Sequence, residues 1–569
     1  MLKLSDLSKQ ERKIIRAWCM YDWANSAFAT SAITAILPVY FVFLFQDALG
    51  SELLVGGFSF TGSSLWSLGA ALSTSIVAVT SPVLGVLGDR MAIRKTLLAI
   101  YMTAGSLFTV LAFFSAYTSS PWAWLLGTFF LGNIGFAGSL VFYNSLLPHV
   151  SPNDELLDDI SSRGYAYGYL GGGLLLLVHL GLNLAFSGSS FADLVTRLSL
   201  ASVGIWWFLW GLWTIKVVPE PPLLNANKAA PFSSAFKDSF SQLAKTFREL
   251  KNFKVMLLYF GAFLLFNDGI QTILAVAGAF AADTLGISLT FNMITILTIQ
   301  FVAAFGAMLF SRIAKLTSTK KALTVSLVGW SFIVLLGVGI APLEPSKLED
   351  HDYQFVYVEN TNIYKVDVAP DLSDSKLDKE WEQNIEGLID ANTKTLSIDQ
   401  AHSLHNLVAE KSQYSSMLFQ GPLNVLNGAS AIGPNHPSTL GSGTLDWWPI
   451  ALRETVWKPL GIPADFQWLL LGIGVGLVMG GSQALARSLF AQIAPKSRSG
   501  EFFSFFGFLN RASYVFGPVL YALVTGILDT RTAVFSILVI IVAGAILLSR
   551  VNVEEGIRVA KEEDARMGL

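Results

Sequence analysis

The chain has 569 residues, of which 53% are hydrophobic and only 14% carry a charge, and its net charge is −3. A soluble protein has about 25% charged residues, so the composition excludes an ordinary soluble enzyme. Apolar runs recur along the sequence, and each is long enough to cross a hydrocarbon layer of about 30 Å as a helix. A single cysteine, Cys19, excludes an internal disulfide framework and a multi-cysteine metal site.

Twelve helical spans are predicted, because helices satisfy their own backbone polar groups in lipid and the runs are too long for barrel strands. The spans are 17–45, 63–88, 96–117, 122–147, 163–187, 197–218, 254–282, 289–314, 320–341, 466–490, 501–527 and 531–550. They predict an all-α membrane protein made of two six-helix bundles. The predicted domains are an N-terminal bundle (1–218), a cytoplasmic linker with an amphipathic helix (219–253), a C-terminal bundle (254–341 and 466–550), an extracytoplasmic insertion (342–465) and a cytoplasmic tail (551–569).

The basic residues predict the orientation in the membrane. Of the 38 Lys and Arg residues, 27 lie in the two terminal segments and in the loops on the same side. The short loops on the other side hold only Arg197 and Arg531. Since cytoplasmic loops are enriched in Lys and Arg, both termini are expected in the cytoplasm. The N-terminus has no short apolar region followed by a small-residue cleavage site, so we expect the first span to direct insertion.

Residues 342–465 then face outward and hold 18 Asp and Glu against 8 Lys and Arg. The segment YQFVYVENTNIYKVDV predicts a strand pair, and SIDQAHSLHNLVAEK predicts a helix with Ser397 and Gln400 at capping-box spacing. We expect a small acidic α/β-like subdomain or, alternatively, a lid or a site for a protein partner. His402 and His405 share a helix face, but without further ligands they predict no metal site.

The two halves of the chain repeat each other. Asp22, Asn25 and Ser26 at the start of the first half correspond to Asp268, Gln271 and Thr272 in the second, and such repeats are typical of transporters. The loop after the second span, GVLGDRMAIRK, resembles the cytoplasmic signature of the major facilitator superfamily. The residues that match this signature, and that the resemblance assigns to a cytoplasmic gate, are Gly85, Asp89, Arg90, Arg94 and Lys95.

The same signature departs from the superfamily pattern at two positions. Ala92 replaces the second glycine, which predicts a relaxed turn. In the corresponding loop of the second half, Lys315 stands where the aspartate is expected. By resemblance, we expect Asp89 to interact with the start of the helix near Ser499, closing the cytoplasmic side.

Five further stretches, in order, are YDWANSAFAT, FYNSLLPHVSP, SSRGYAYGYLGGG, FNDGIQTI and GGSQALARSLFAQIAP. Together they resemble the autophagy-linked vacuolar amino-acid effluxer family and its prokaryotic relatives, over nearly the whole chain except 342–465. The resemblance implies the major facilitator fold and transport of small neutral amino acids, which the fungal members move out of the vacuole lumen. It places this chain in a bacterial inner membrane or, alternatively, in a vacuolar membrane.

Asp268 and Arg511 are the charged residues deepest within the predicted spans. A charge at the bilayer centre costs about 2.5–3.5 kcal/mol on insertion scales. We hypothesise that both face a central cavity, where Arg511 binds the carboxylate of a zwitterion and Asp268 its amine; alternatively, they form a static ion pair. Three neutral side chains are candidates for substrate binding or, alternatively, for hydrogen bonds between helices: Gln271, Thr272 and Gln483.

Asp22 opens the first span close to its cytoplasmic end. It is expected to pair with Arg163 as a breakable contact between the first and fifth spans, with Asn25 and Asn144 as polar neighbours. The alternatives are solvation of a helix end and a direct contact with the substrate. These residues complete the predicted gate.

The sequence therefore predicts a secondary transporter of a small organic solute, working by alternating access, with a proton as a candidate coupling ion. The alternatives are a proton-coupled exporter of drugs or other small organic molecules, and a membrane receptor or scaffold that acts through the acidic insertion. The sequence contains no Walker lysine motif, zincin helix or nucleophile elbow. Neither an enzyme activity, a cofactor nor a nucleic-acid partner is expected.

Overall fold

The computed structural model describes residues 6–49, 53–55, 58–60, 62–186, 189–221, 253–287, 289–370, 372, 376–386, 388–389, 394–421, 429–441, 443–513 and 516–567. The N-terminal half (N-half) consists of α1 (Lys9–Ala27), η2 (Phe28–Ile36), α2 (Leu37–Leu49), β1 (Leu53–Val55), β2 (Phe58–Phe60), α3 (Gly62–Met91), α4 (Arg94–Leu111), η3 (Ala112–Tyr117), α5 (Pro121–Ser145), α6 (Leu147–Val150), η4 (Asp154–Leu156), α7 (Leu157–Ala185) and α8 (Ala192–Val217). The predicted amphipathic helix within 219–253 lies outside the described residues.

The C-terminal half (C-half) consists of α10 (Lys254–Leu285), α11 (Leu289–Leu316), α12 (Thr319–Val338), α17 (Ala464–Ile493), η8 (Lys496–Arg498), α18 (Ser499–Ala512), α19 (Phe516–Ile527) and α20 (Thr530–Ser549). The chain ends with α21 (Val553–Met567), a helix that was not predicted in the tail.

The twelve predicted spans all correspond to helices. Ten described helical segments are long and apolar enough to cross a membrane, and two shorter apolar segments, Leu68–Ser81 and Phe516–Thr525, lie in the predicted second and eleventh spans. The eleventh span is not continuous as predicted, because α18 ends at Ala512 and α19 begins at Phe516. The prediction of an all-α major facilitator fold with an outer α/β insertion is confirmed.

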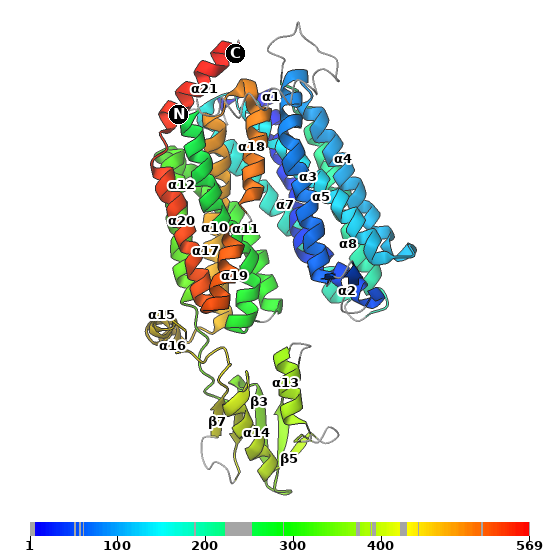
Figure 1. Cartoon of the computed structure of the whole chain (residues 1–569), viewed down its shortest axis with the longest axis vertical. Coiled ribbons are helices and arrows are strands. Elements are labelled where there is room, and N and C mark those ends of the chain that lie inside the picture. Colours follow the sequence, from blue (N-terminus) through cyan, green and yellow to red (C-terminus); the bar gives the residue numbers. More distant parts are fainter. Residues whose placement is uncertain are drawn as a thin grey trace.

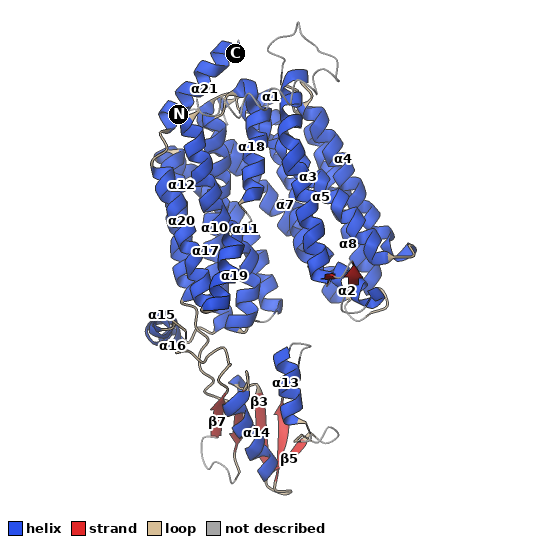
Figure 2. Cartoon of the chain, viewed as in Figure 1, coloured by secondary structure: helices blue, strands red, loops and turns tan. Residues whose placement is uncertain are grey.

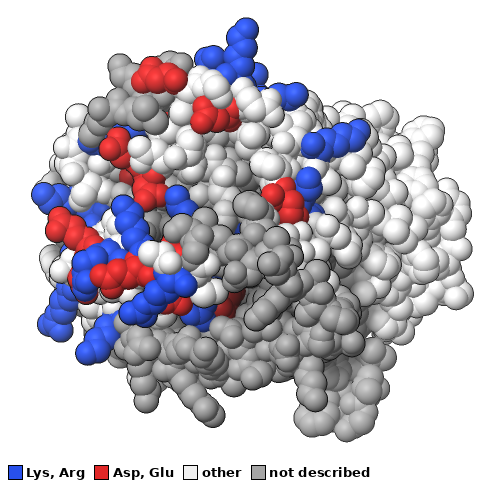
Figure 3. All heavy atoms as spheres, turned by 90° about the horizontal axis from the view of Figure 1, so that it is seen from above, with Lys and Arg blue, Asp and Glu red and all other residues white. Residues whose placement is uncertain are grey.

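The two halves lie side by side, closest at the end that carries both described termini and diverging toward the other end (Figure 1). We call these ends the termini side and the insertion side. Among the described residues, both halves are helical except for the short strand pair β1–β2, and the main sheet lies in the insertion (Figure 2). Basic side chains, with acidic ones among them, gather over one part of the termini side, and much of the rest of this face is uncharged (Figure 3).

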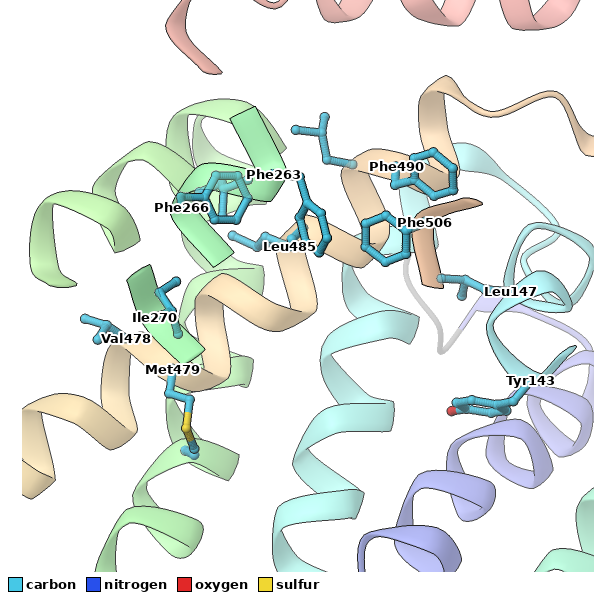
Figure 4. Packing of buried hydrophobic residues seen from close by; sticks show 14 of the residues in the cluster. Tyr143, Leu147, Phe263, Phe266, Ile270, Val478, Met479, Leu485, Phe490 and Phe506 are labelled. Carbon is cyan, nitrogen blue, oxygen red and sulfur yellow. The ribbon is translucent and has the colours of Figure 1, made fainter. Parts of the chain in front are cut away.

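Within each half, small residues and aromatic rings allow close packing. In the N-half, a Cβ on Gly135 would collide with the backbone of Gly105, so α4 and α5 cross in contact. In the C-half, the ring of Phe506 lies 4.4 Å from that of Phe263 and 4.7 Å from that of Phe490 (Figure 4). These rings place α10, α17 and α18 around one buried cluster.

The insertion forms a five-stranded sheet below the C-half (Figure 1). Its strands are β3 (Tyr353–Val358), β4 (Ile363–Val368), β5 (Thr395–Ser397), β6 (Ser415–Phe419) and β7 (Ala429–Ile432), in the order β5-β4-β3-β6-β7. The predicted strand pair is confirmed as the antiparallel pair β3–β4. The predicted capping box is also confirmed, since Ser397 and Gln400 exchange hydrogen bonds at the start of α14 (Ile398–Lys411).

Helices complete the insertion and connect its sheet to the membrane part. Helix α13 (Lys376–Ile385) and α14 enclose a core that includes Trp381 and Leu404. The segments α15 (Trp447–Leu452), η7 (Arg453–Trp457) and α16 (Lys458–Leu460) follow the sheet. The indole of Trp448 donates to the carbonyl of Leu335 at the end of α12.

The insertion is expected to lose stability as the pH falls. Burial and the nearby His402 and His351 lower the pKa of His405 to about 4. A histidine in the unfolded chain has a pKa near 6.5, so between about pH 6.5 and pH 4 the folded protein binds fewer protons than the unfolded chain. The contribution of the neutral His405 to the free energy of unfolding is therefore complete above about pH 6.5 and is lost as the pH falls toward 4. Because the imidazole is partly exposed, we expect a loss on the order of 1 kcal/mol.

Hydrogen–deuterium exchange of the full-length protein, corrected for intrinsic rates, measures this loss as faster exchange of α14 and β6 amides at about pH 5 than at pH 7. His405→Gln should weaken the pH dependence. An unchanged dependence in that variant would contradict the assignment to His405.

Candidate functional site

A cavity of about 940 Å³ lies between the two halves. Its N-half lining comes from α1, η2, α3, α5 and α7, and its C-half lining from α10, α11, α17 and α18. Amide side chains are frequent in this lining: Asn25, Asn133, Asn144, Asn267, Gln271, Gln300, Gln483 and Asn510. Among the lining residues that the structure describes, only Asp22 and Arg487 are charged. The described lining therefore offers one anion, one cation and many neutral hydrogen-bonding groups.

Asp22 and Arg487 form an ion pair that joins the two halves. Nη1 of Arg487, on α17, lies 3.2 Å from Oδ2 of Asp22, on α1, and both side chains are buried. The phenol of Tyr143 donates to the same carboxylate oxygen at 2.8 Å. A buried charge must be paired and hydrogen-bonded to be tolerated, and here each charge satisfies the other across the interface.

Arg487 makes four hydrogen bonds, all to the N-half. Besides Asp22, its guanidinium donates to Oδ1 of Asn144 and to the side-chain and backbone oxygens of Ser161. Its planar face lies over the rings of Trp18 and Tyr165, at 4.9 and 4.1 Å. A guanidinium suits this position because its donors point in fixed directions and its face stacks on aromatic rings.

The predicted pairing of Asp22 with Arg163 is wrong. Arg163 instead lies 3.6 Å from Asp159, one turn earlier on α7, with its side chain 40% exposed. Arg487 was missed because it lies close to the cytoplasmic end of the predicted span 466–490 and was therefore counted among the 27 basic residues of the cytoplasmic side, not as a charge within a span. It lies six residues before Ile493, the last residue of α17, which is about 9 Å into the helix. Pro495 marks where the helix must end, and Arg487 lies about two turns before it. This spacing was the signal in the sequence that Arg487 lies inside the helix.

A second group of contacts joins the halves on the termini side of this ion pair. The buried carboxylate of Asp158 on α7 accepts hydrogen bonds from Ser488 of α17 and from Thr319 of α12. Its neighbour Asp159 lies 3.3 Å from Nζ of Lys315. Lys315, which stands where the signature has an aspartate, thus pairs with an acidic residue of the opposite half.

Of the predicted substrate-binding residues on α10, Asp268 and Thr272 do not line the cavity. Asp268 is buried and accepts a hydrogen bond from the backbone N–H of Phe516, the first residue of α19, at 3.1 Å. Thr272 is buried against Gly517 of the same helix. Both residues hold α10 against the start of α19. The side chain of Arg511 lies outside the described residues.

The two predicted glutamines do line the cavity. Gln483 accepts a hydrogen bond from the phenol of Tyr169 at 2.7 Å, and Gln271 donates to Asn267. Among the described residues, the amide nitrogen of Asn25 and the amide oxygen of Gln300 are buried without a hydrogen-bond partner. Buried polar groups are nearly always satisfied, and both residues belong to the cavity lining, so these two unsatisfied atoms lie in the cavity wall.

The signature residues lie where α3 meets the C-half. A Cβ on Gly85 would collide with the side chain of Ser504 and the backbone of Gly500, so α3 and α18 are in direct contact. This puts α3 beside the start of α18, the helix expected near Ser499. The side chains of Asp89 and Arg90 lie outside the described part of the chain.

The basic residues after the turn are also engaged. Arg94 is buried, and its Nη1 lies 3.0 Å from Nε2 of His149, which in turn lies 2.9 Å from Oγ of Ser499 in the C-half. The backbone N–H of Lys95 donates to Glu220 and its Nζ to the carbonyl of Val218. Arg94 thus reaches the opposite half through His149, whereas the hydrogen bonds of Lys95 described here stay within its own half.

The turn after α3 is not relaxed as predicted. Ala92 has φ +50°, a conformation that costs an alanine on the order of 1 kcal/mol relative to glycine. We expect Ala92→Gly to raise the thermal unfolding temperature by about one or two degrees, with a gain below about 1 kcal/mol because glycine also gains entropy in the unfolded state. Differential scanning fluorimetry of the purified protein measures this change, and a lower midpoint would contradict it.

Comparisons with known proteins agree with this architecture. The family model described as "Vacuole effluxer Atg22 like" matches residues 10–349 and 445–561, which leaves out most of the insertion. The chain is 22% identical over 559 residues to the uncharacterized MFS-type transporter YxiO of Bacillus subtilis, covering 98% of this chain and 99% of that protein. It is also 22% identical over 590 residues to autophagy-related protein 22 of Kluyveromyces lactis, covering 97% and 96%.

The fold is similar to that of the major facilitator superfamily proton:xylose symporter XylE, with a TM-score of 0.53 and 12% identity over 95% of this chain and 96% of that chain. This likeness concerns the fold alone, whereas the family match covers most of the sequence. The chain therefore belongs to the Atg22-like effluxer family and is a multi-pass membrane transporter of the major facilitator superfamily.

Proposed function

We propose that the protein transports small, polar organic solutes without net charge, with neutral amino acids as the first candidates, by alternating access through the cavity between its halves. The observation that carries this proposal is the charge of the lining as far as the structure describes it: one carboxylate and one guanidinium, in contact, among amide and hydroxyl groups. An anion or a cation without a counter-charge would meet an already neutral site. A zwitterion offers a partner to each of the two charges.

The contacts between the halves support an alternating mechanism. The ion pair of Asp22 with Arg487 and the hydrogen bonds of Asp158 lie toward the termini side, and the halves diverge toward the insertion side (Figure 1). The structure thus corresponds to a state closed at the termini side. Opening that side requires Arg487 to leave four N-half acceptors, which a bound solute can replace in part.

The termini side is proposed to be cytoplasmic, because it carries the excess of Lys and Arg. The insertion then lies outside the cytoplasm, and a bacterial inner membrane is the proposed location. Asp22 is the proposed acceptor of a coupling proton, since protonation would remove the charge that holds Arg487.

Thermal stabilisation of the purified protein by ligands tests this function. Neutral amino acids are expected to raise the unfolding temperature, because a ligand that binds only the folded state stabilises it by mass action. The shift should be absent in Gln300→Ala combined with Asn25→Ala, which removes both unpartnered amides. The control Asn183→Ala removes an amide that donates to the backbone of His179 and is not in the cavity lining.

Uptake of the stabilising amino acid into proteoliposomes, with and without a pH gradient, measures transport and proton coupling. Stabilisation by drug-like cations but by no amino acid would favour the alternative exporter. Full ligand binding without transport would favour a receptor.

A further inference from the structure

The segment between α17 and α18 forms part of the closed termini side. Nζ of Lys496 lies 3.1 Å from Oδ1 of Asp154, and Oγ of Ser499 lies 2.9 Å from Nε2 of His149, both in the N-half. One residue later, Gly500 meets Gly85 of α3. We call residues 495–500 the gate segment. Its position decides whether these contacts with the N-half form.

The C-terminal helix α21 holds the gate segment from the other side. Oδ2 of Asp564 accepts the backbone N–H of Lys496 at 3.0 Å, and Oδ1 accepts both the N–H and the hydroxyl of Ser497, at 2.8 and 2.6 Å. These N–H groups belong to the first turn of η8, where a carboxylate acts as a helix cap. One residue earlier, Glu563 lies 3.3 Å from the buried Arg498.

The helix itself is fixed to the C-half. The side chain of Asn552 accepts the N–H of Glu555 and begins α21. Gly556 packs against Ile493 of α17 and Val255 of α10, and Ala560 is buried. The helix thus presents Glu563 and Asp564 to the gate segment from a rigid support.

We propose that α21 is a gate-positioning element: through Asp564 and Glu563 it holds the gate segment in the conformation that contacts the N-half, and so favours closure of the termini side. The chain tail would thereby control the equilibrium between the two access states. This inference goes beyond the proposed function, because it depends on neither the substrate nor the coupling ion.

The distance between the halves on the termini side tests this role in the full-length protein. Spin labels at Glu155→Cys in the N-half and Thr317→Cys in the C-half occupy exposed positions, and the native Cys19 is buried. Asp564→Ala removes three hydrogen bonds to the gate segment, so the ratio of closed to open molecules is expected to fall about tenfold, as for the loss of a strong helix cap.

The matched control is Glu562→Ala, which removes a carboxylate of the same helix that pairs only with Arg558 among the contacts described. It should leave the distance distribution unchanged. Asp564→Asn, a milder variant, is expected to give an intermediate shift and serves if the alanine variant does not fold. An unchanged distribution in the folded Asp564 variant, or an equal shift in Glu562→Ala, would overturn the proposal. Failure of amino acids to stabilise the protein would instead concern the proposed function alone.

Discussion

Arg487→Ala is expected to open the termini side and to reduce transport at least a hundredfold. The substitution removes all four hydrogen bonds from the Arg487 side chain to the N-half and leaves the buried Asp22 without its cation. Removing one partner of a buried ion pair costs about 3–5 kcal/mol. This cost corresponds to a fall of more than about a hundredfold in the ratio of closed to open molecules. Proteoliposome uptake and the label pair at Glu155→Cys and Thr317→Cys measure the two effects separately.

Two further variants separate the charge from the geometry. Arg487→Lys keeps the cation but cannot donate to Asp22, Asn144 and Ser161 together, so an intermediate loss is expected. In Arg487→Ala combined with Asp22→Asn the unpaired charge is gone, so thermal stability should recover while transport stays low. Arg312→Ala, an exposed cation on α11, is the control. Normal transport by Arg487→Ala would remove the ion pair from the mechanism.

Gly85→Val is expected to prevent closure of the termini side while the protein still folds. Any Cβ at this position collides with the backbone of Gly500 and the side chain of Ser504, and a backbone neighbour cannot move out of the way. The collision is removed at the lowest cost in free energy when α3 separates from α18, and these two helices belong to different halves. We expect the open state to dominate, with transport reduced about tenfold or more.

The matched comparison uses glycines in other surroundings. A Cβ added to Gly127 would lie in open space, so Gly127→Val should leave the distance distribution unchanged. Gly135 touches Gly105 within the N-half, so Gly135→Val should lower the folding yield instead of opening the gate. If Gly85→Val closes normally, the contact of α3 with α18 is not part of the gate.

The sequence was informative wherever a feature is local. Span positions follow from long apolar runs, and the capping box of Ser397 with Gln400 follows from spacing alone. The pairing of Asp22 was not predictable in this way, because Arg487 lies 465 positions away and was counted with the basic residues of the cytoplasmic side. Arg163, the nearer candidate in the sequence, is held by Asp159 on its own helix.

Depth in a span also proved a poor guide to the cavity. Asp268 lies near the middle of α10, yet its carboxylate caps the first residue of α19. Phe516 begins α19, so its N–H has no acceptor within the helix. Gly517-Pro518 in the run 501–527 was the unused signal that the helix is interrupted there. Gln271, three residues after Asp268, turns to the cavity instead. Asp268 and Gln271 lie on different faces of α10. Which face is turned to the cavity depends on how α10 packs against the helices on either side.

Gln467 has a consequence for engineering the chain. Its amide exchanges hydrogen bonds with the backbone N–H and carbonyl of Ala341, so the segment leaving α12 and the helix entering α17 are fastened together at the neck of the insertion. The five-stranded sheet thus leaves and rejoins the membrane part at a closed base, whereas α15 and η7 themselves bond to the end of α12. A fluorescent reporter or an affinity tag in place of the sheet, with α15 to α16 retained, is expected to leave both flanking helices in position.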